Sequence, residues 1–431
     1  MIRRRSRAGA DGETKQTPEN VMEIRPILST LLRHKTAAAL IIVEIALTCA
    51  IICNALFMIG DRIQQLNETS GIAEKELVRV QIISIGGDKN AAALTATDLA
   101  SLRAIPGVKD ATVLNQVPFV NSSWNSGLKL RHDQERPTLN ATSYMVEEHY
   151  LNALGLKLVA GRDFEPGEYI SSQQFNDPDA NARVAAAVIT RKLGEALFPG
   201  ENPVGKVYYS WSDEPTRIVG VVDHLVRPSM QGGPAAREFT VIYPIRPSYD
   251  VGGNYVIRTE PGRRAEVLKA AVAALRANSN TRIVLEDNTK TFEELRREFY
   301  QNQRSMAWLL AIVCIGLLLI TALGIIGLAS FWVQQRTRQI GVRRALGATR
   351  AQILRYFQTE NFVLATAGIA LGMLLAFGLN QWLMSKYELP RLPLWYMPVG
   401  AVALWLLGQI AVLGPARRAA MVPPAIATRS A

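Results

Sequence analysis

MAWLLAIVCIGLLLITALGIIGLASFWV, residues 306–333, is an apolar stretch without a single charged residue. An α-helix needs about 20 apolar residues to cross the hydrocarbon core of a bilayer. It also satisfies its own backbone hydrogen bonds there, where water is absent. Three more runs share this character, at residues 36–60, 361–384 and 394–414. The sequence therefore predicts a membrane protein with four transmembrane α-helices.

The chain between the first and second runs, residues 61–305, is hydrophilic and mixes two kinds of pattern. Short β-branched segments bounded by Gly, Pro and Asn are typical of strands. They lie at 76–85, 185–190, 216–226, 239–246 and 254–259. Segments with helical periodicity lie at 95–105 and 262–279. We expect a large α+β extracytoplasmic domain with two lobes, inserted between helices 1 and 2.

Both ends of this inserted domain have a helical pattern. Residues 61–77 would prolong the first span outward, and residues 289–306 would lead into the second. In the latter segment Phe292, Leu295 and Phe299 share one helical face. These two helical stalks would join the domain to the membrane.

The distribution of basic residues predicts the topology. Lys and Arg concentrate in residues 1–35, 334–360 and 415–431, and short flanks rich in these residues stay in the cytoplasm. Residues 61–305 and the short loop 385–393 then lie outside. Because this topology accounts for most of the net charge of +11, we expect no nucleic-acid partner.

No segment has the pattern of a catalytic or ligand site. Residues 200–207, GENPVGKV, match a phosphate loop except that Val207 replaces the final Ser or Thr. A phosphate loop also follows a strand and opens a helix, whereas here a helix-like segment leads through a turn into a strand-like one. The histidines lack zinc-ligand spacing, and residues 177–188 lack the Gly and the final Glu of a calcium loop. We therefore expect no catalytic residue, no cofactor and no metal.

The segment RTRQIGVRRALGATRAQILRYFQTE, residues 336–360, is the most informative loop. Val342, Leu346, Thr349 and Ile353 follow a helical spacing, so the segment is expected to form a short amphipathic helix. Two roles fit that pattern. A basic amphipathic helix can lie on anionic membrane lipid, or it can dock a cytoplasmic partner. Periodicity alone favours the lipid anchor.

The same loop resembles a known signature. RTRQIGVRRALGATRAQI, residues 336–353, is similar to the signature of FtsX-type permeases, the membrane subunits of MacB-like ABC systems. Segments 154–164, 186–207 and 216–226 resemble the MacB-type periplasmic core domain, and the tail 415–429 resembles the usual ending of such permeases. The order of elements also agrees, with one span, a large domain and then three spans.

The resemblance implies a permease that works as a homodimer or with a paralogous permease, driven by a cytoplasmic ABC ATPase on a partner chain. It implies a multi-pass protein of the bacterial inner membrane with cytoplasmic termini, and it leaves open a periplasmic adaptor with an outer-membrane channel. Gln339 stands where the family commonly has Glu, which puts an acidic contact at that position in doubt. The residues that the resemblance assigns to ATPase coupling are Arg336, Arg338, Gln339, Ile340, Gly341, Arg343, Arg344, Ala345, Leu346, Gly347, Ala348 and Thr349.

Two features inside the membrane runs invite interpretation. Glu44 lies in the first run, where a charge is costly; it would reach the inner interface or pair across a dimer. Gly368, Gly372 and Ala376 recur every four residues, a stripe that allows close helix packing. The stripe would serve packing within one subunit or dimerisation.

Three functions share this architecture. The first is export of an unknown substrate, with ATP hydrolysis moving the external domain. The second is FtsX-like signalling to a periplasmic cell-wall hydrolase, and the third is release of lipoproteins. The MacB-type segments of the external domain favour export. A membrane-anchored enzyme is disfavoured because no catalytic constellation is present.

Overall fold

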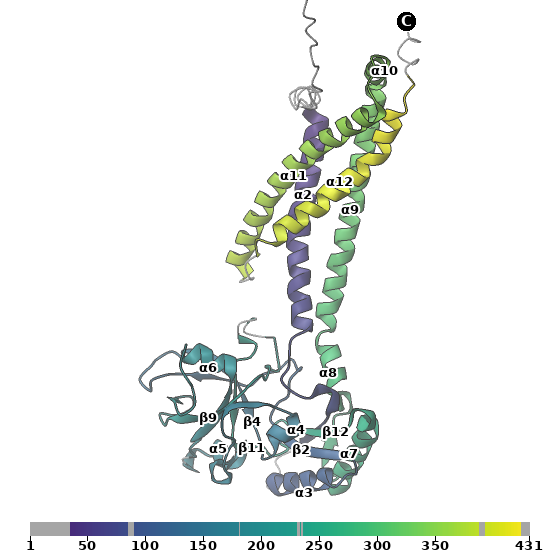
Figure 1. Cartoon of the computed structure of the whole chain (residues 1–431). Helices are drawn as coiled ribbons and strands as arrows, with labels where there is room; N and C mark the ends of the chain where they lie inside the picture. Colours follow the sequence, from purple (N-terminus) through teal and green to yellow (C-terminus); the bar gives the residue numbers. More distant parts are fainter. Residues whose placement is uncertain are drawn as a thin grey trace, which may run out of the picture. The chain divides into compact units, whose positions relative to one another are not determined.

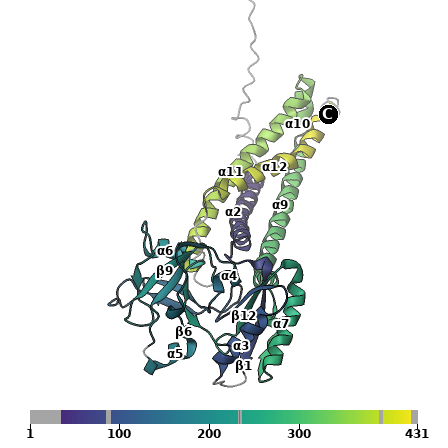
Figure 2. The same ribbon diagram turned by 60° about the horizontal axis from the view of Figure 1, so that its bottom comes forward.

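The computed structural model describes residues 35–84, 90–180, 182–230, 233, 236–387 and 393–423. The chain divides into two compact units (Figures 1 and 2). The membrane unit comprises the chain up to Ile63 and from Met306 onward, and the outer domain comprises Gln64–Ser305. The basic residues expected at the N-terminus before Lys35, most of the short loop 385–393 and the tail beyond Pro423 lie outside the described residues.

Four long helices confirm the predicted spans. Each is long and apolar enough to cross a membrane. They extend past the apolar runs because helical hydrogen bonds continue into the polar flanks, so that α11 already begins inside the predicted loop 334–360. The helices are α2 (Lys35–Leu66), α9 (Gln301–Gln335), α11 (Arg350–Tyr387) and α12 (Tyr396–Ala420), with the short α10 (Thr337–Ala345) between α9 and α11.

Helix α2 is the most buried of the four spans, and α9 is the least. Polar contacts join α2 to its neighbours. The hydroxyls of Thr48 and Thr321 on α9 lie 2.8 Å apart. The Asn54 amide donates to the carbonyl of Ala376 on α11 at 3.3 Å. Interhelical hydrogen bonds of this kind support packing where lipid supplies no hydrophobic drive between helices.

The first lobe of the outer domain is an antiparallel sheet covered by two helices (Figure 2). Val78, Val80 and Tyr255 form its core with Leu102 and Leu275 from the helices. The strand order is β13 (Arg282–Val284), β1 (Leu77–Ser84), β12 (Asn254–Thr259) and β2 (Val108–Leu114), with β14 (Lys290–Thr291) also paired to β1. The helices are α3 (Ala91–Arg103) and α7 (Arg264–Asn278).

The second lobe is a mixed sheet with its own core, which confirms two lobes. β4 pairs in parallel with β10, and β7 with β9. The strand order is β3 (Asn125–Leu128), β4 (Leu139–Met145), β10 (Thr240–Tyr243), β7 (Ala186–Thr190), β9 (Thr216–Val222) and β5 (Leu158–Gly161), with β8 (Val207–Tyr208) on β9. The short helices α4 (Tyr150–Leu154), α5 (Ser172–Asn176) and α6 (Arg191–Leu197) and the strand pair β6 (Ile170–Ser171) and β11 (Ile245–Arg246) complete it.

The expected stalks are shorter than the sequence indicated. Helix α2 ends at Leu66, well before residue 77. Helix α8 (Phe292–Phe299) begins at a capping box in which Thr291 and Glu294 exchange hydrogen bonds. Its Phe292 and Leu295 are buried in a third core cluster that includes strands of both sheets. The predicted apolar face is therefore real, but it packs into the domain.

GENPVGKV forms a turn between α6 and β8. Gly200 and Gly205 both adopt positive φ, at 76° and 88°, as tight turns require. Lys206 pairs with Glu201 rather than facing an open cradle. This local order, helix then turn then strand, is the reverse of a phosphate loop.

Replacing Asp98 should destabilise the first lobe. Its carboxylate is fully buried, receives the Arg282 guanidinium and accepts from Tyr255 at 2.5 Å. Burial, with Asp98 beside it, raises the pKa of Tyr255, which keeps this phenol a neutral donor. Asp98→Ala leaves Arg282 buried without a counter-charge, which typically costs about 3–5 kcal/mol of unfolding free energy.

Hydrogen exchange of β1 and α7 in the full-length protein measures this loss. Glu286→Ala is the matched control because its pair with Arg276 is largely exposed and should contribute little. Equal exchange in the two variants would contradict a structural role for Asp98.

Candidate functional sites

The α10 segment, residues 336–349, begins at a buried ion pair. Nη1 of Arg336 lies 3.0 Å from both carboxylate oxygens of Glu360 on α11. The two side chains are only 10% and 2% exposed, and the guanidinium also lies over the Trp332 ring, 5.6 Å from its centroid. Arg336 is therefore not on the accessible surface, unlike the contact expected from sequence. It positions α10 against α11 instead.

A local stop signal ends α10 at Ala345. The prediction of one amphipathic helix through residues 342–353 is therefore wrong. Gly347 has φ +100°, a left-handed conformation. The amide of Ala348 donates to the carbonyl of Arg343 at 3.0 Å, and that of Gly347 to Arg344 at 3.2 Å. These two bonds are the Schellman arrangement that closes a helix. Val342 and Ile353 therefore belong to different helices and do not share one face.

Helix α11 starts immediately afterwards with its own cap. The amide of Thr349 donates to Oε1 of Gln352 at 2.8 Å, and the amide of Gln352 donates to Oγ1 of Thr349 at 3.3 Å. This reciprocal pair is a capping box. Thr349 is thus a cap residue, and the turn between the two helices is set by the sequence Gly-Ala-Thr.

The α10 segment has a buried side and an open side. Ile340 is buried beside Val333, Phe357 and Ala416, and Gly341 is buried as well. On the open side Leu346 is 83% exposed, and Arg343 lies over the Tyr356 ring at 5.1 Å. Arg344 and Ala348 are half-buried. The other exposed positions are Arg338, Gln339, Val342, Ala345, Gly347 and Thr349.

The open side combines exposed aliphatic tips with guanidinium groups, and residues 334–358 contain no acid. Such a surface suits a partner that presents an apolar pocket with acidic groups, and it also suits anionic lipid. Contacts hold the segment at both ends, with the Arg336–Glu360 pair at its start and the Thr349–Gln352 cap at its end. A flexible lipid anchor would not need such contacts.

The small-residue stripe on α11 faces α2 within the chain. A Cβ added to Gly372 would lie 2.5 Å from that of Cys49, and one added to Gly368 would lie 2.8 Å from that of Ile45. Ala376 is fully buried. The stripe thus allows α11 to approach α2 closely inside one subunit.

Glu44 lies on α2 against Gly324 of α9. A Cβ added to Gly324 would be 2.5 Å from its Oε1, so the absence of a side chain at Gly324 leaves room for the carboxylate. Glu44 is half-buried. Its environment is therefore the α2–α9 contact.

A second polar cluster lies in the outer domain, next to the points where α2 ends and α9 begins. Arg237 of the second lobe contacts Glu68 through Nη2 at 2.6 Å and Nε at 2.8 Å. The Tyr300 hydroxyl donates to the same carboxylate. Burial, with Glu68 beside it, raises the pKa of Tyr300, so the phenol stays protonated. Arg237 also donates to the Ser229 carbonyl at 2.6 Å.

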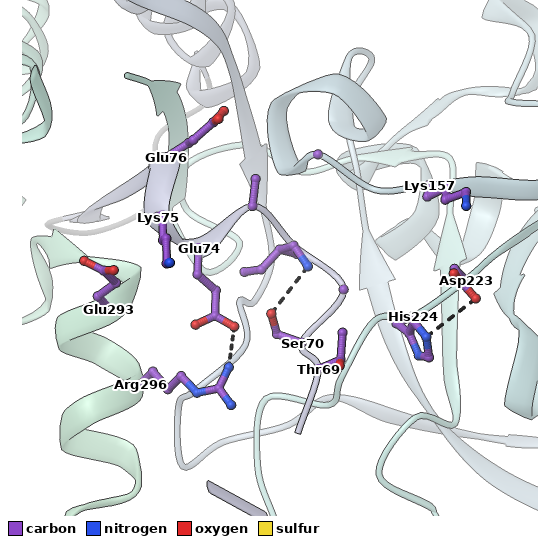
Figure 3. A pocket seen from close by; sticks show the side chains of 14 residues that line it. Thr69, Ser70, Glu74, Lys75, Glu76, Lys157, Asp223, His224, Glu293 and Arg296 are labelled. Carbon is purple, nitrogen blue, oxygen red and sulfur yellow. Dashed lines mark hydrogen bonds and ion pairs between the residues drawn. The ribbon is translucent and has the colours of Figure 1, made fainter. Parts of the chain in front are cut away.

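Arg296 of α8 completes this cluster. Its Nη2 donates to the carbonyls of Leu66 and Glu68 at 2.8 and 2.6 Å. Its Nη1 contacts Glu74 at 2.5 Å (Figure 3). We call Glu68, Arg237, Arg296 and Tyr300 the clamp. It ties the chain leaving α2 to the chain entering α9 and fixes both to the second lobe.

A groove of about 610 Å³ lies beside the clamp and is drawn in Figure 3. Its lining carries acidic and basic side chains, including Glu76 and Lys157, together with His224. Arg258 and then Lys109 hold the pKa of Glu76 below its ordinary value. His224 contacts Glu238 through Nδ1 at 2.8 Å. Within the part of the chain that the structure describes, no group of His, Cys, Asp and Glu could hold a metal ion.

Sequence reasoning missed Glu360 and the whole clamp. Glu360 directly precedes the apolar run 361–384, and an acid at such a boundary is a signal that could have been weighed. The clamp residues are separated by up to 232 positions. No local pattern marks them.

Two family models cover most of the chain. The MacB-like periplasmic core domain matches residues 38–275, and the FtsX-like permease C-terminal domain matches residues 311–424. The uncharacterized ABC transporter permease YknZ of Bacillus subtilis is 24% identical over 94% of this chain and 98% of its own length.

Other relatives are longer than this chain. The macrolide export ATP-binding/permease protein MacB of Chromobacterium violaceum is 25% identical over 95% of this chain, which spans 63% of that protein. Among solved structures, the periplasmic region of MacB from Actinobacillus actinomycetemcomitans is 17% identical over 55% of this chain and 97% of its own, with a TM-score of 0.32. The assignment rests on the family models.

Removing one partner of the Arg336–Glu360 pair should destabilise the membrane unit. Glu360→Met leaves a buried guanidinium unpaired, which typically costs about 3–5 kcal/mol. The double variant Arg336→Met, Glu360→Met removes both charges and should recover most of that loss, because a buried pair often contributes little over apolar residues. Thermal unfolding in mild detergent measures both. A double variant as unstable as Glu360→Met would refute the unpaired-charge explanation.

Proposed function

Because the chain belongs to the family of ABC transporter permeases with a MacB-like periplasmic core domain and an FtsX-like permease domain, we propose that it couples a cytoplasmic ABC ATPase to movement of its outer domain. The permease itself is non-catalytic, and the ATPase is on a partner chain. The observation that carries this proposal is the α10 segment, which is attached by the buried Arg336–Glu360 pair yet exposes Leu346.

The open side of α10 is the proposed ATPase contact. Arg338, Gln339, Arg343 and Leu346 would meet the partner directly, whereas Arg336 and Ile340 hold the segment in place from its buried side. A docking element must transmit force without yielding, and a buried ion pair at its base meets that need. A segment that only anchors the chain to lipid does not need to transmit force. The buried ion pair therefore favours the docking role of α10 over the lipid-anchor role.

The clamp is the proposed point where movement enters the outer domain. Force on α2 arrives at Leu66 and force on α9 arrives at Gln301. Arg296 grips the carbonyl of Leu66, and Tyr300 directly precedes Gln301. Arg296 also donates to the carbonyl of Glu68, and Tyr300 donates to its carboxylate. Because both residues contact Glu68, the two helices would act on the domain together. The adjoining groove would change shape as the clamp moves.

This permease would sit in the bacterial inner membrane, with residues 334–360 and both termini cytoplasmic and residues 61–305 and 385–393 periplasmic. It would work as a homodimer or with a paralogous permease. Several relatives are named for macrolide export, and export of an unidentified substrate, with an adaptor and an outer-membrane channel, is the function that we extend to this chain. The MacB-like domain over residues 38–275 favours export over signalling or lipoprotein release.

Leu346→Asp should abolish recovery of the ATPase. An interface centred on an exposed apolar side chain typically loses tenfold or more in affinity when a charge replaces it. The test is affinity purification of the full-length permease from its native host in mild detergent, followed by identification of an ATP-binding subunit. Ile283→Asp is the matched control, since Ile283 is an exposed aliphatic residue of the outer domain.

Wild type and Ile283→Asp should both retain the ATPase, and Leu346→Asp should lose it. Equal retention by all three proteins would show that the open side of α10 is not the contact. If none of them retains an ATPase after crosslinking, coupling itself is refuted.

A further inference from the structure

The membrane unit contains a groove between α11 and α12 that plays no part in the function proposed above. Its volume is about 240 Å³, and it is lined by Arg355, Gln358, Thr359, Phe362 and Gln409. None of the described residues that line it is acidic. The groove is distinct from the open side of α10, because none of the residues that line the groove belongs to the α10 segment.

The polar end of the groove carries an exposed cation. Arg355 forms no ion pair with any described residue, in contrast to Arg336, which is paired, and Arg343, which is stacked on a ring. Beside it Nε2 of Gln409 donates to the carbonyl of Gln358 at 3.4 Å, which joins the two helices across the groove. This end therefore offers positive charge and amide groups.

The other end is apolar and aromatic. Phe362 is 46% exposed and stacks on Trp405 of α12, with ring centroids 5.7 Å apart and planes at 21°. The indole is oriented by its bond to Thr366 Oγ1 at 3.1 Å. Phe362 follows Arg355 by seven positions, so the helix places them about 10 Å apart along its axis.

This arrangement has the length and polarity of one amphiphile. Phe362 begins the apolar run of α11, so Arg355 lies at the level of lipid headgroups once α11 crosses the membrane. An Arg near the membrane surface attracts anionic headgroups. The exposed part of Phe362, which Trp405 supports from behind, offers an apolar surface to an acyl chain.

We propose that the α11–α12 groove binds one anionic phospholipid, with its phosphate at Arg355 and an acyl chain against Phe362. The site requires only that the chain is a membrane protein, so its failure would leave the proposed coupling untouched. A bound lipid there would brace α11 against α12 over the stretch of α11 that contains Glu360, which lies between Arg355 and Phe362 in the sequence.

Native mass spectrometry of the full-length protein in detergent tests the site. The probes are dioleoyl phosphatidylglycerol, dioleoyl phosphatidylcholine and glycerol 3-phosphate, which carries the phosphate without acyl chains. Wild type should retain one phosphatidylglycerol in preference to phosphatidylcholine. Arg355→Gln should weaken that binding about five-fold, and Arg355→Lys should restore most of it. Phe362→Ala should also weaken it.

Arg350→Gln is the matched control, because Arg350 is an exposed residue of the same helix outside the groove. Its phosphatidylglycerol binding should equal that of wild type. If Arg350→Gln and Arg355→Gln lost phosphatidylglycerol binding equally, the lipid would be responding to general surface charge, and the proposed site would be wrong. Equal retention of both lipids, or displacement of the lipid by millimolar glycerol 3-phosphate, would also overturn it.

Discussion

The pairing of Arg336 with Glu360 is the constraint on which the proposed docking segment depends. A carboxylate that is 2% exposed at the start of an apolar span is costly unless a cation meets it. Glu360 is thereby held to the end of α9, where the chain turns into α10. This contact fixes the start of α10, and the packing of Ile340 fixes its buried side, which leaves Leu346 on the open side. The local stop at Gly347 then limits α10 to a short helix.

The clamp places a comparable constraint in the outer domain. The Glu68 carboxylate accepts from Arg237 and Tyr300, and Arg296 donates to the backbone carbonyls of Leu66 and Glu68. Charge-assisted hydrogen bonds of this kind are stronger and more directional than neutral ones. Within the membrane unit, the contacts between helices include small residues and hydroxyls, as in the approach of Gly372 to Cys49 and the pair Thr48–Thr321. Such contacts let helices pack closely without fixing them by charge.

The sequence was sufficient for features whose causes are local. Apolar length predicted the four spans, and β-branched runs predicted the strands β1 and β12 of the first sheet and β7, β9 and β10 of the second. Other strands of both sheets, including β2 and β4, were missed. GENPVGKV could be dismissed as a phosphate loop from its neighbours alone. The single helix through residues 342–353 was wrong because a periodic pattern outweighed Gly347, a stop signal present in the sequence. Glu360 and the clamp could not be predicted, because their partners are set by tertiary packing.

The most direct test of the account is hydrogen exchange at residues 66–76 and 292–300 in the permease reconstituted in lipid nanodiscs with its ATPase. Exchange is compared without nucleotide and with ATP trapped by vanadate. If movement passes from α10 through α2 and α9 to the clamp, trapping should change the protection of both segments together, because Arg296 and Glu68 join them. Unchanged exchange in these segments, with the ATPase bound and active, would contradict the account.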